Sequence, residues 1–177
     1  MAVALGVALI HGPAAGQTHA ELRTGLTVGN HTATAAGLDL VPKLSFEALV
    51  LRQLSPRFSA YGGFARTAFG CEEGFCTDRD LTVTGNHGVL GGEARERGAW
   101  LRLGLLFGSM KVGSEGEADD PGPGIHAGAG YTFDSGRLSF TPGLSYRWMS
   151  ASTAIGSAHA VALSAEVGVR IRVGSAP

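Results

Sequence analysis

The stretch from Val161 to Val173 reads Val-Ala-Leu-Ser-Ala-Glu-Val-Gly-Val-Arg-Ile-Arg-Val. Its odd-numbered positions are all apolar, whereas its even-numbered positions carry Ala162, Ser164, Glu166, Gly168, Arg170 and Arg172. Neighbouring side chains of a β-strand point to opposite faces, so this alternation predicts a strand with one apolar face and one polar or small face. At about 13 residues the run exceeds an ordinary globular strand and can cross a bilayer at a tilt. The stretch therefore predicts a membrane-spanning β-barrel.

The composition supports a chain with apolar surface facing lipid. Among 177 residues only 16% are charged and 28 are glycine, against roughly 25% charged residues and roughly 7% glycine in typical soluble domains. The formal net charge of −1 gives no electrostatic case for nucleic-acid binding. No apolar run reaches the roughly 18 residues of a membrane helix.

Seven further segments alternate in the same way, and together they predict an all-β, eight-stranded antiparallel up-and-down transmembrane barrel. The eight expected strands span about residues 21–34, 44–54, 57–69, 80–94, 99–110, 124–134, 136–149 and 161–173. The alternation fails around Gly85 to Gly88, where we expect a bulge. Pro142 lacks a ladder donor, so we expect it at a bulge or near a strand end.

The connections alternate in length. Tight turns are expected around Ser55-Pro56-Arg57, residues 95–98 and residues 134–136, and longer connections mostly fall between them. Bacterial outer-membrane barrels have short periplasmic turns and longer outer loops. Both chain ends are then expected on the periplasmic side, with Tyr131 and Phe133 near an inner turn and Trp148 near an outer loop.

An eight-stranded barrel leaves an interior that side chains fill. The small and ionic face fits such a lumen, and the bulky apolar face fits lipid. We therefore expect Leu103, Leu144 and Val167 on the outside, with Arg102 and Arg147 inside. A soluble lipocalin-like barrel around a small apolar ligand would have the opposite arrangement.

The inward face is expected to carry a network of charges, because an unpaired buried charge costs several kcal/mol. Glu47 and Glu166 are expected to be ringed by arginines. The network favours an ionic plug over a narrow ion pathway. Its candidate members are Arg23, Glu47, Arg102, His126, Arg147, Glu166, Arg170 and Arg172.

These features resemble the small outer-membrane β-barrel proteins of Gram-negative envelopes, the OmpA/OmpX-like eight-stranded class. The resemblance covers roughly residues 21–173 and rests on the alternation, the turn-loop asymmetry and turns such as Leu54-Ser55-Pro56-Arg57. It implies location in the Gram-negative outer membrane, contact with outer-membrane lipid, and the barrel assembly machinery as a partner during biogenesis. Many such barrels end in an aromatic residue that this machinery reads, but here Val173 is followed by Gly174-Ser175-Ala176-Pro177.

The domain organisation expected is a signal peptide at 1–20, a barrel at 21–173 and a short tail at 174–177. Residues 2–10 form an apolar run, and Thr18-His19-Ala20 or Ala14-Ala15-Gly16 could serve as a cleavage site, although no Lys or Arg precedes the run. Cys71 and Cys76 flank Glu-Glu-Gly-Phe, which in an exported protein favours a local disulfide over a metal site.

The sequence favours a non-enzymatic barrel whose loops serve envelope integrity, adhesion or surface recognition by an unidentified extracellular partner. A lipid-modifying enzyme is the alternative, because Ser157 and His159 share a strand face, but no carboxylate is placed to orient the imidazole. The acidic residues 115–120 match no EF-hand spacing, the six histidines are dispersed, and no cofactor is expected.

Overall fold

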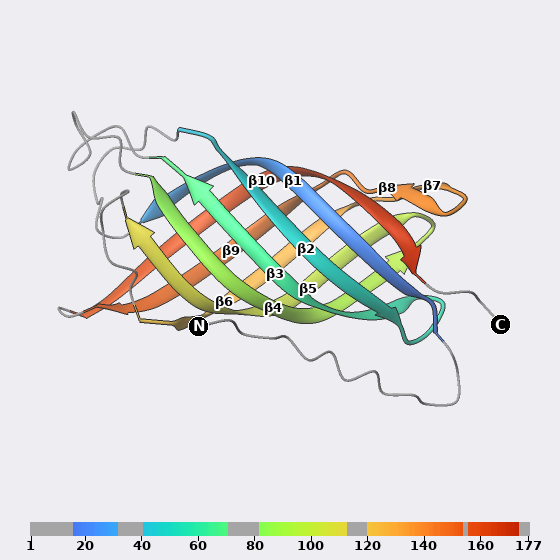
Figure 1. The fold of residues 1–177 in the computed structure, drawn as a ribbon, viewed down its shortest axis with the longest axis horizontal. Coiled ribbons are helices and arrows are strands. Elements are labelled where there is room, and N and C mark those ends of the chain that lie inside the picture. Colours follow the sequence, from blue (N-terminus) through green and yellow to red (C-terminus); the bar gives the residue numbers. More distant parts are fainter. Residues whose placement is uncertain (1–15, 32–40, 71–81, 113–119, 154–155, 174–177) are drawn as a thin grey trace.

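The computed structural model of the chain describes residues 16–31, 41–70, 82–112, 120–153 and 156–173. These residues form strands and connecting turns (Figure 1). The long strands are β1 (Thr18–His31), β2 (Lys43–Gln53), β3 (Phe58–Phe69), β4 (Val83–Glu96), β5 (Ala99–Val112), β6 (Gly122–Tyr131), β9 (Gly143–Thr153) and β10 (Gly156–Val173). Two short strands, β7 (Phe133–Ser135) and β8 (Leu138–Phe140), form a hairpin.

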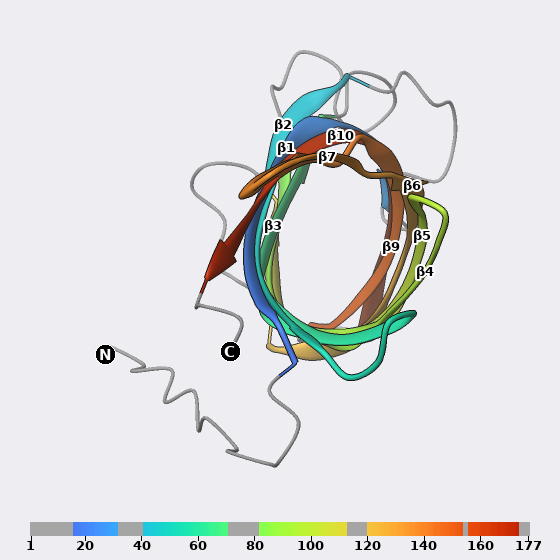
Figure 2. The ribbon, with the colours of Figure 1, turned by 90° about the vertical axis from the view of Figure 1, so that its right-hand side faces the viewer.

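The sheet closes on itself. Each of β1 to β5 pairs antiparallel with the next strand, β6 pairs with β9, β9 pairs with β10, and β10 pairs with β1. Viewed along the barrel, these eight strands make a ring (Figure 2). The predicted eight-stranded antiparallel barrel is confirmed.

Pro142 interrupts the seventh crossing of the wall. β8 and β9 keep one register against β10, with Phe140 opposite Val169 and Gly143 opposite Glu166. The break at Thr141 and Pro142 therefore shifts no residue, and the Pro142 carbonyl still accepts a hydrogen bond from the Tyr131 amide at 3.1 Å. Pro142 lies between two strand segments, where its missing N–H leaves a gap in the ladder.

The expected bulge near Gly85 is wrong. β4 pairs with β3 from Val83 opposite Phe69 to Ala94 opposite Phe58 without a skipped residue. Small residues obscured the alternation in this strand, because glycines on either face carry no apolar signal.

The short connections and both ends of the described chain lie at the same end of the barrel. Thr18 pairs with Val173, and the connections 54–57, 97–98 and 136–137 join strands at this end. The turn after β4 is a two-residue hairpin with φ of 49° at Arg97 and 87° at Gly98. We call this end the turn end and the opposite one the loop end.

The two faces of the wall have the predicted orientation. Leu103, Leu144 and Val167 are 60%, 57% and 46% exposed, whereas Arg102 and Arg147 are 1% and 0% exposed. The outside of the barrel is thus a belt of Leu, Val, Ile and Phe, which suits a hydrocarbon surround. No helix among the described residues is long and apolar enough to cross a membrane.

β1 begins earlier than expected. Thr18, His19 and Ala20 pair with Val173, Arg172 and Ile171. Cleavage after Ala20 would remove three paired residues, whereas cleavage after Gly16 would leave the ladder complete. The proposed signal peptide otherwise lies in residues 1–15, outside the described part of the chain.

Candidate functional site: the barrel lumen

Eight ionisable side chains lie in the middle of the lumen, and their formal charges cancel. Strand alternation brings four glutamates and four arginines to the inside, and each residue is at most 5% exposed. We call this group the ionic cluster. It consists of Glu21, Arg23, Glu47, Glu93, Arg102, Arg147, Glu166 and Arg170.

Glu21 accepts four hydrogen bonds, three of them from arginines. Its Oε2 accepts from Arg102 Nη2 at 2.7 Å and from Arg170 Nε at 2.7 Å, while Oε1 accepts from Arg23 Nη1 at 2.7 Å. The Thr141 hydroxyl also donates to Oε1, at 3.2 Å. Three arginines from three strands therefore converge on one carboxylate, which links β1, β5 and β10.

Glu93 makes a second such centre. Arg102 Nε and Arg170 Nη2 donate to its Oε2 at 2.8 and 2.7 Å, and Arg170 Nη1 and Arg95 Nη2 donate to Oε1 at 3.1 and 2.9 Å. Glu166 is the third, and it accepts from Arg23 at 3.0 Å, Arg147 at 2.8 Å and the Ser145 hydroxyl at 2.7 Å.

Glu47 differs from the other three glutamates. Arg23, Arg102, Arg147 and His126 place nitrogens 3.7 to 3.9 Å from its oxygens. These are ion-pair distances without hydrogen bonds, and both oxygens are buried without a hydrogen-bond partner among the described residues. Three arginines therefore lie around Glu47, but the contact is looser than in the rest of the cluster.

Aromatic rings brace the arginines. The guanidinium carbons of Arg23 and Arg102 lie 4.7 and 4.8 Å from the centroid of Trp100, which is 3% exposed. Tyr61 lies under Arg102 at 5.6 Å, and its hydroxyl is 3.1 Å from His126 Nδ1. The aromatic rings orient the guanidinium groups, and the glutamates neutralise them. Both effects reduce the free-energy cost of burying these arginines.

A packed apolar layer accompanies the ionic cluster. Buried side chains from several strands line the interior, among them Phe69, Leu106, Met110 and Met149 at 2% exposure or less. Ions and apolar groups together leave the interior filled, and this arrangement stabilises the barrel wall.

The structure brings together seven of the eight residues predicted from the sequence. The eighth, Arg172, is exposed near the end of β10, where the strand runs past the cluster to the turn end, and it lines the cavity there together with Arg170. Two members were missed. Glu21 lies two residues before Arg23 and therefore on the same inward face, so the alternation was sufficient to predict it. Glu93 could not be assigned to a face, because a bulge was expected earlier in β4.

Several other candidates lie outside the described residues. They include Cys71, Cys76 and most of the acidic stretch 115–120; the Ser157 side chain is likewise not described. His159 stacks on Trp148 with ring centroids 5.5 Å apart. The described residues hold no group of three or more His, Cys, Asp or Glu side chains that could bind a metal.

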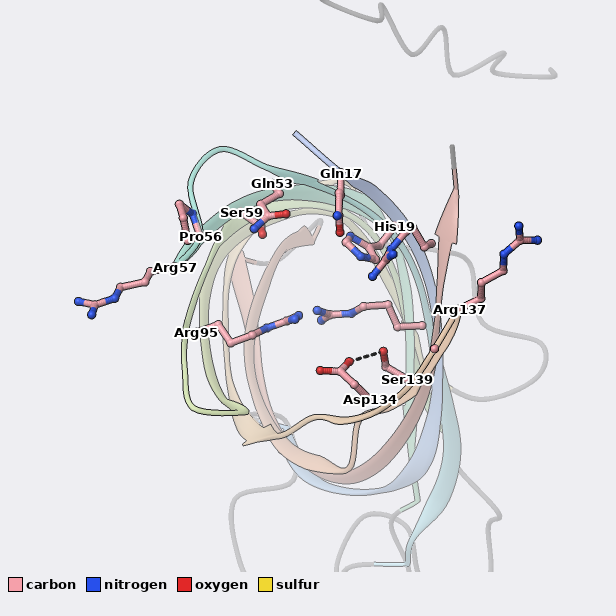
Figure 3. A pocket seen from close by; sticks show the side chains of 13 residues that line it. Gln17, His19, Gln53, Pro56, Arg57, Ser59, Arg95, Asp134, Arg137 and Ser139 are labelled. Atoms are coloured by element: carbon pink, nitrogen blue, oxygen red, sulfur yellow. Dashed lines mark hydrogen bonds between the residues drawn. The ribbon is translucent and has the colours of Figure 1, made fainter. Parts of the chain in front are cut away.

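A small cavity opens at the turn end, beside Arg170 (Figure 3). Its volume is about 240 Å³. Arg95 extends into it from β4, and Asp134 is hydrogen-bonded to Ser139 in the β7–β8 hairpin. The ionic cluster meets this cavity through Arg170.

Comparison with solved structures identifies the fold. The Neisserial surface protein A superposes with a TM-score of 0.64 at 9% identity, covering 88% of this chain and 97% of that one. The attachment invasion locus protein Ail of Yersinia pestis, in complex with the heparin analogue sucrose octasulfate, gives a TM-score of 0.53 at 19% identity, covering 88% and 99%. The chain therefore has the OmpA/OmpX-like fold of small eight-stranded outer-membrane barrels.

No protein-family profile matches the chain, and no curated protein sequence matches it. At these identities the structural likeness establishes the fold and not the activity.

Proposed function

We propose that the chain is a non-enzymatic barrel of the Gram-negative outer membrane whose loop-end segments serve surface recognition, adhesion or envelope integrity. The observation that carries this proposal is the combination of an apolar outer belt with a filled, charge-balanced lumen. The belt suits lipid contact, and the packed interior suits a scaffold better than a pore.

The charges of the sequence are unevenly divided between the two ends. The segments that join strands at the loop end, 32–42, 70–82 and 113–121, contain nine carboxylates and one arginine, Arg79. The carboxylates are Asp39, Glu72, Glu73, Asp78, Asp80, Glu115, Glu117, Asp119 and Asp120. A surface of this composition favours a basic or neutral partner, because like charges repel at an interface. The sulfated ligand bound to Ail is therefore a poor guide to the partner of this chain.

The proposal is tested by fractionation and surface staining. One epitope is inserted after Gly116, and another, in a separate variant, after Val173. We expect both variants in the outer-membrane fraction, extractable only with detergent. Intact cells should stain through the first epitope, and permeabilised cells through both. Release of the protein without detergent would favour the soluble ligand-binding barrel.

Recognition by the loop-end segments is tested with the barrel in lipid nanodiscs. Immobilised heparin should retain neither the native chain nor a variant in which Glu115, Glu117, Asp119 and Asp120 are replaced by their amides. Saturable retention of the native chain on heparin would contradict the charge argument.

A further inference from the structure

The cavity at the turn end combines a surplus of arginines with neutral hydrogen-bonding groups. Its lining comes from the start of β1, the β2–β3 turn, β4, the β7–β8 hairpin and the end of β10. Figure 3 shows Arg95 directed into the opening and Arg137 directed away from it. The cavity is thus built by segments from both halves of the sequence.

The positive charge of this cavity is not cancelled locally. All four glutamates of the ionic cluster lie against its four arginines, so Arg95 is a fifth arginine sharing Glu93. Arg57 pairs with Glu96 at 3.1 Å. Arg137 and Arg172 form no ion pair within the described part of the chain, and Asp134 is the remaining carboxylate in the lining.

Residues 1–15 and 174–177, which adjoin the described ends of β1 and β10, contain neither Asp nor Glu. Arg95, which shares Glu93 with two other arginines, and Arg172 stand against Asp134 alone in the lining, so the cavity carries a surplus of positive charge at neutral pH.

We propose that this cavity binds a small oxyanion of the phosphate class. Guanidinium groups donate paired N–H bonds to phosphate oxygens, and Arg95 and Arg172 lie on opposite walls of the opening. Gln17, Gln53 and Ser59 add neutral groups that can hydrogen-bond the same oxygens. At about 240 Å³ the cavity is smaller than the roughly 300–1,000 Å³ of sites for drug-sized ligands, which suits one phosphate or pyrophosphate group.

Two sources present this chemistry at the turn end. One is a free phosphorylated compound. The other is the phosphate headgroup of a lipid in the leaflet that meets this end, which the rim arginines could reach. Both use the same arginines, so the experiment must distinguish them by the lipid that surrounds the barrel.

The test is calorimetric titration of pyrophosphate into the full barrel, reconstituted in nanodiscs of phosphatidylcholine or of phosphatidylglycerol. In phosphatidylcholine we expect saturable binding that weakens at least tenfold in the double variant Arg95→Gln/Arg172→Gln. Arg97→Gln is the control for the local field, because it removes one positive charge at the same end from a residue that does not line the cavity. Arg95 is the surplus arginine of the cluster, so its removal leaves the buried charges balanced, and unchanged heat-dependent gel mobility will verify folding.

The possible outcomes distinguish a free phosphorylated compound from a lipid headgroup, and both from a cavity that does not bind phosphate. Equal pyrophosphate affinity in both nanodiscs assigns the site to a free phosphate compound. A several-fold weaker affinity in phosphatidylglycerol, abolished in the double variant, assigns it to a lipid headgroup. Absence of saturable binding, or an equal loss in Arg97→Gln, would overturn the proposal by showing a diffuse positive field only. None of these results depends on whether the loop end recognises a partner.

Discussion

Replacing Glu21 with Gln should destabilise the barrel more than the same substitution at Glu47. Glu21 accepts hydrogen bonds from Arg23, Arg102 and Arg170 at 2.7 Å each. A glutamine keeps only one of the two oxygens, so in either orientation it turns an N–H group towards at least one guanidinium. The change also leaves four buried arginines with three carboxylates.

The magnitude follows from these losses. One charge-assisted hydrogen bond contributes about 1.5–3 kcal/mol, and removal of one partner from a buried ion pair costs about 3–5 kcal/mol. We expect Glu21→Gln to lower the free energy of unfolding by about 3–5 kcal/mol. Glu47→Gln is the matched control, because Glu47 is a buried glutamate that accepts no hydrogen bond among the described residues and lies 3.8–3.9 Å from its three arginines. Its cost should be smaller by about the 1.5–3 kcal/mol of one such bond.

The assay is equilibrium unfolding in lipid vesicles by urea, followed by the fluorescence of Trp100 and Trp148. The slope of free energy against urea should be unchanged, so that the midpoint reports stability. The double variant Glu21→Gln/Arg102→Met should recover part of the loss, since it restores the balance of buried charge. Equal losses for Glu21→Gln and Glu47→Gln, or a loss below about 1 kcal/mol for the former, would refute the view that short hydrogen bonds organise the cluster.

Three further predictions test the wall and the belt. Gly91→Ala should cost about 1–3 kcal/mol in the same assay, because its Cβ would overlap the Leu103 carbonyl and the Tyr61 hydroxyl, whereas a Cβ at Gly88 meets nothing closer than 3.7 Å and Gly88→Ala should be near neutral. Leu103→Arg should cost up to about 2–4 kcal/mol in lipid vesicles, since Leu103 is 60% exposed on the apolar belt; an unchanged midpoint would place this face against water. The unheated native chain should migrate differently from the boiled chain in a detergent gel, and identical migration would argue against a closed barrel.

Alternation in the sequence was sufficient to predict the closed barrel, its direction and most of its buried charges. It works where large apolar residues mark one face, as in β5 and β10. It fails in β4, where Gly85, Gly88, Gly91 and Gly92 give the two faces the same appearance, so that Glu93 was not assigned to the lumen.

Contacts within the lumen could not be predicted in the same way. Parity assigns Glu21 and Glu47 to the same interior, but only the tilt and register of the strands decide which one lies at hydrogen-bonding distance from the arginines. The position of Arg172 beyond the cluster also depends on where the wall ends, which alternation does not reveal. The alternation predicted that Trp100 lies on the face opposite to Leu101. It did not predict that the Trp100 ring stacks on the guanidinium groups of Arg23 and Arg102.

The ladder between β1 and β10 joins residues more than a hundred positions apart, including Glu21 opposite Arg170. Such distant pairing makes folding slow, because the chain must lose the entropy of closing a long loop before the contacts between its ends can form. Because β10 is the last strand along the chain, the seam cannot form until almost the entire polypeptide is available. The glutamates and arginines that will neutralise one another are therefore hydrated until then, and insertion of the apolar exterior must be coupled to closure. A nascent chain stopped before β10 cannot close its sheet, so its apolar exterior stays exposed to water until the last seam forms.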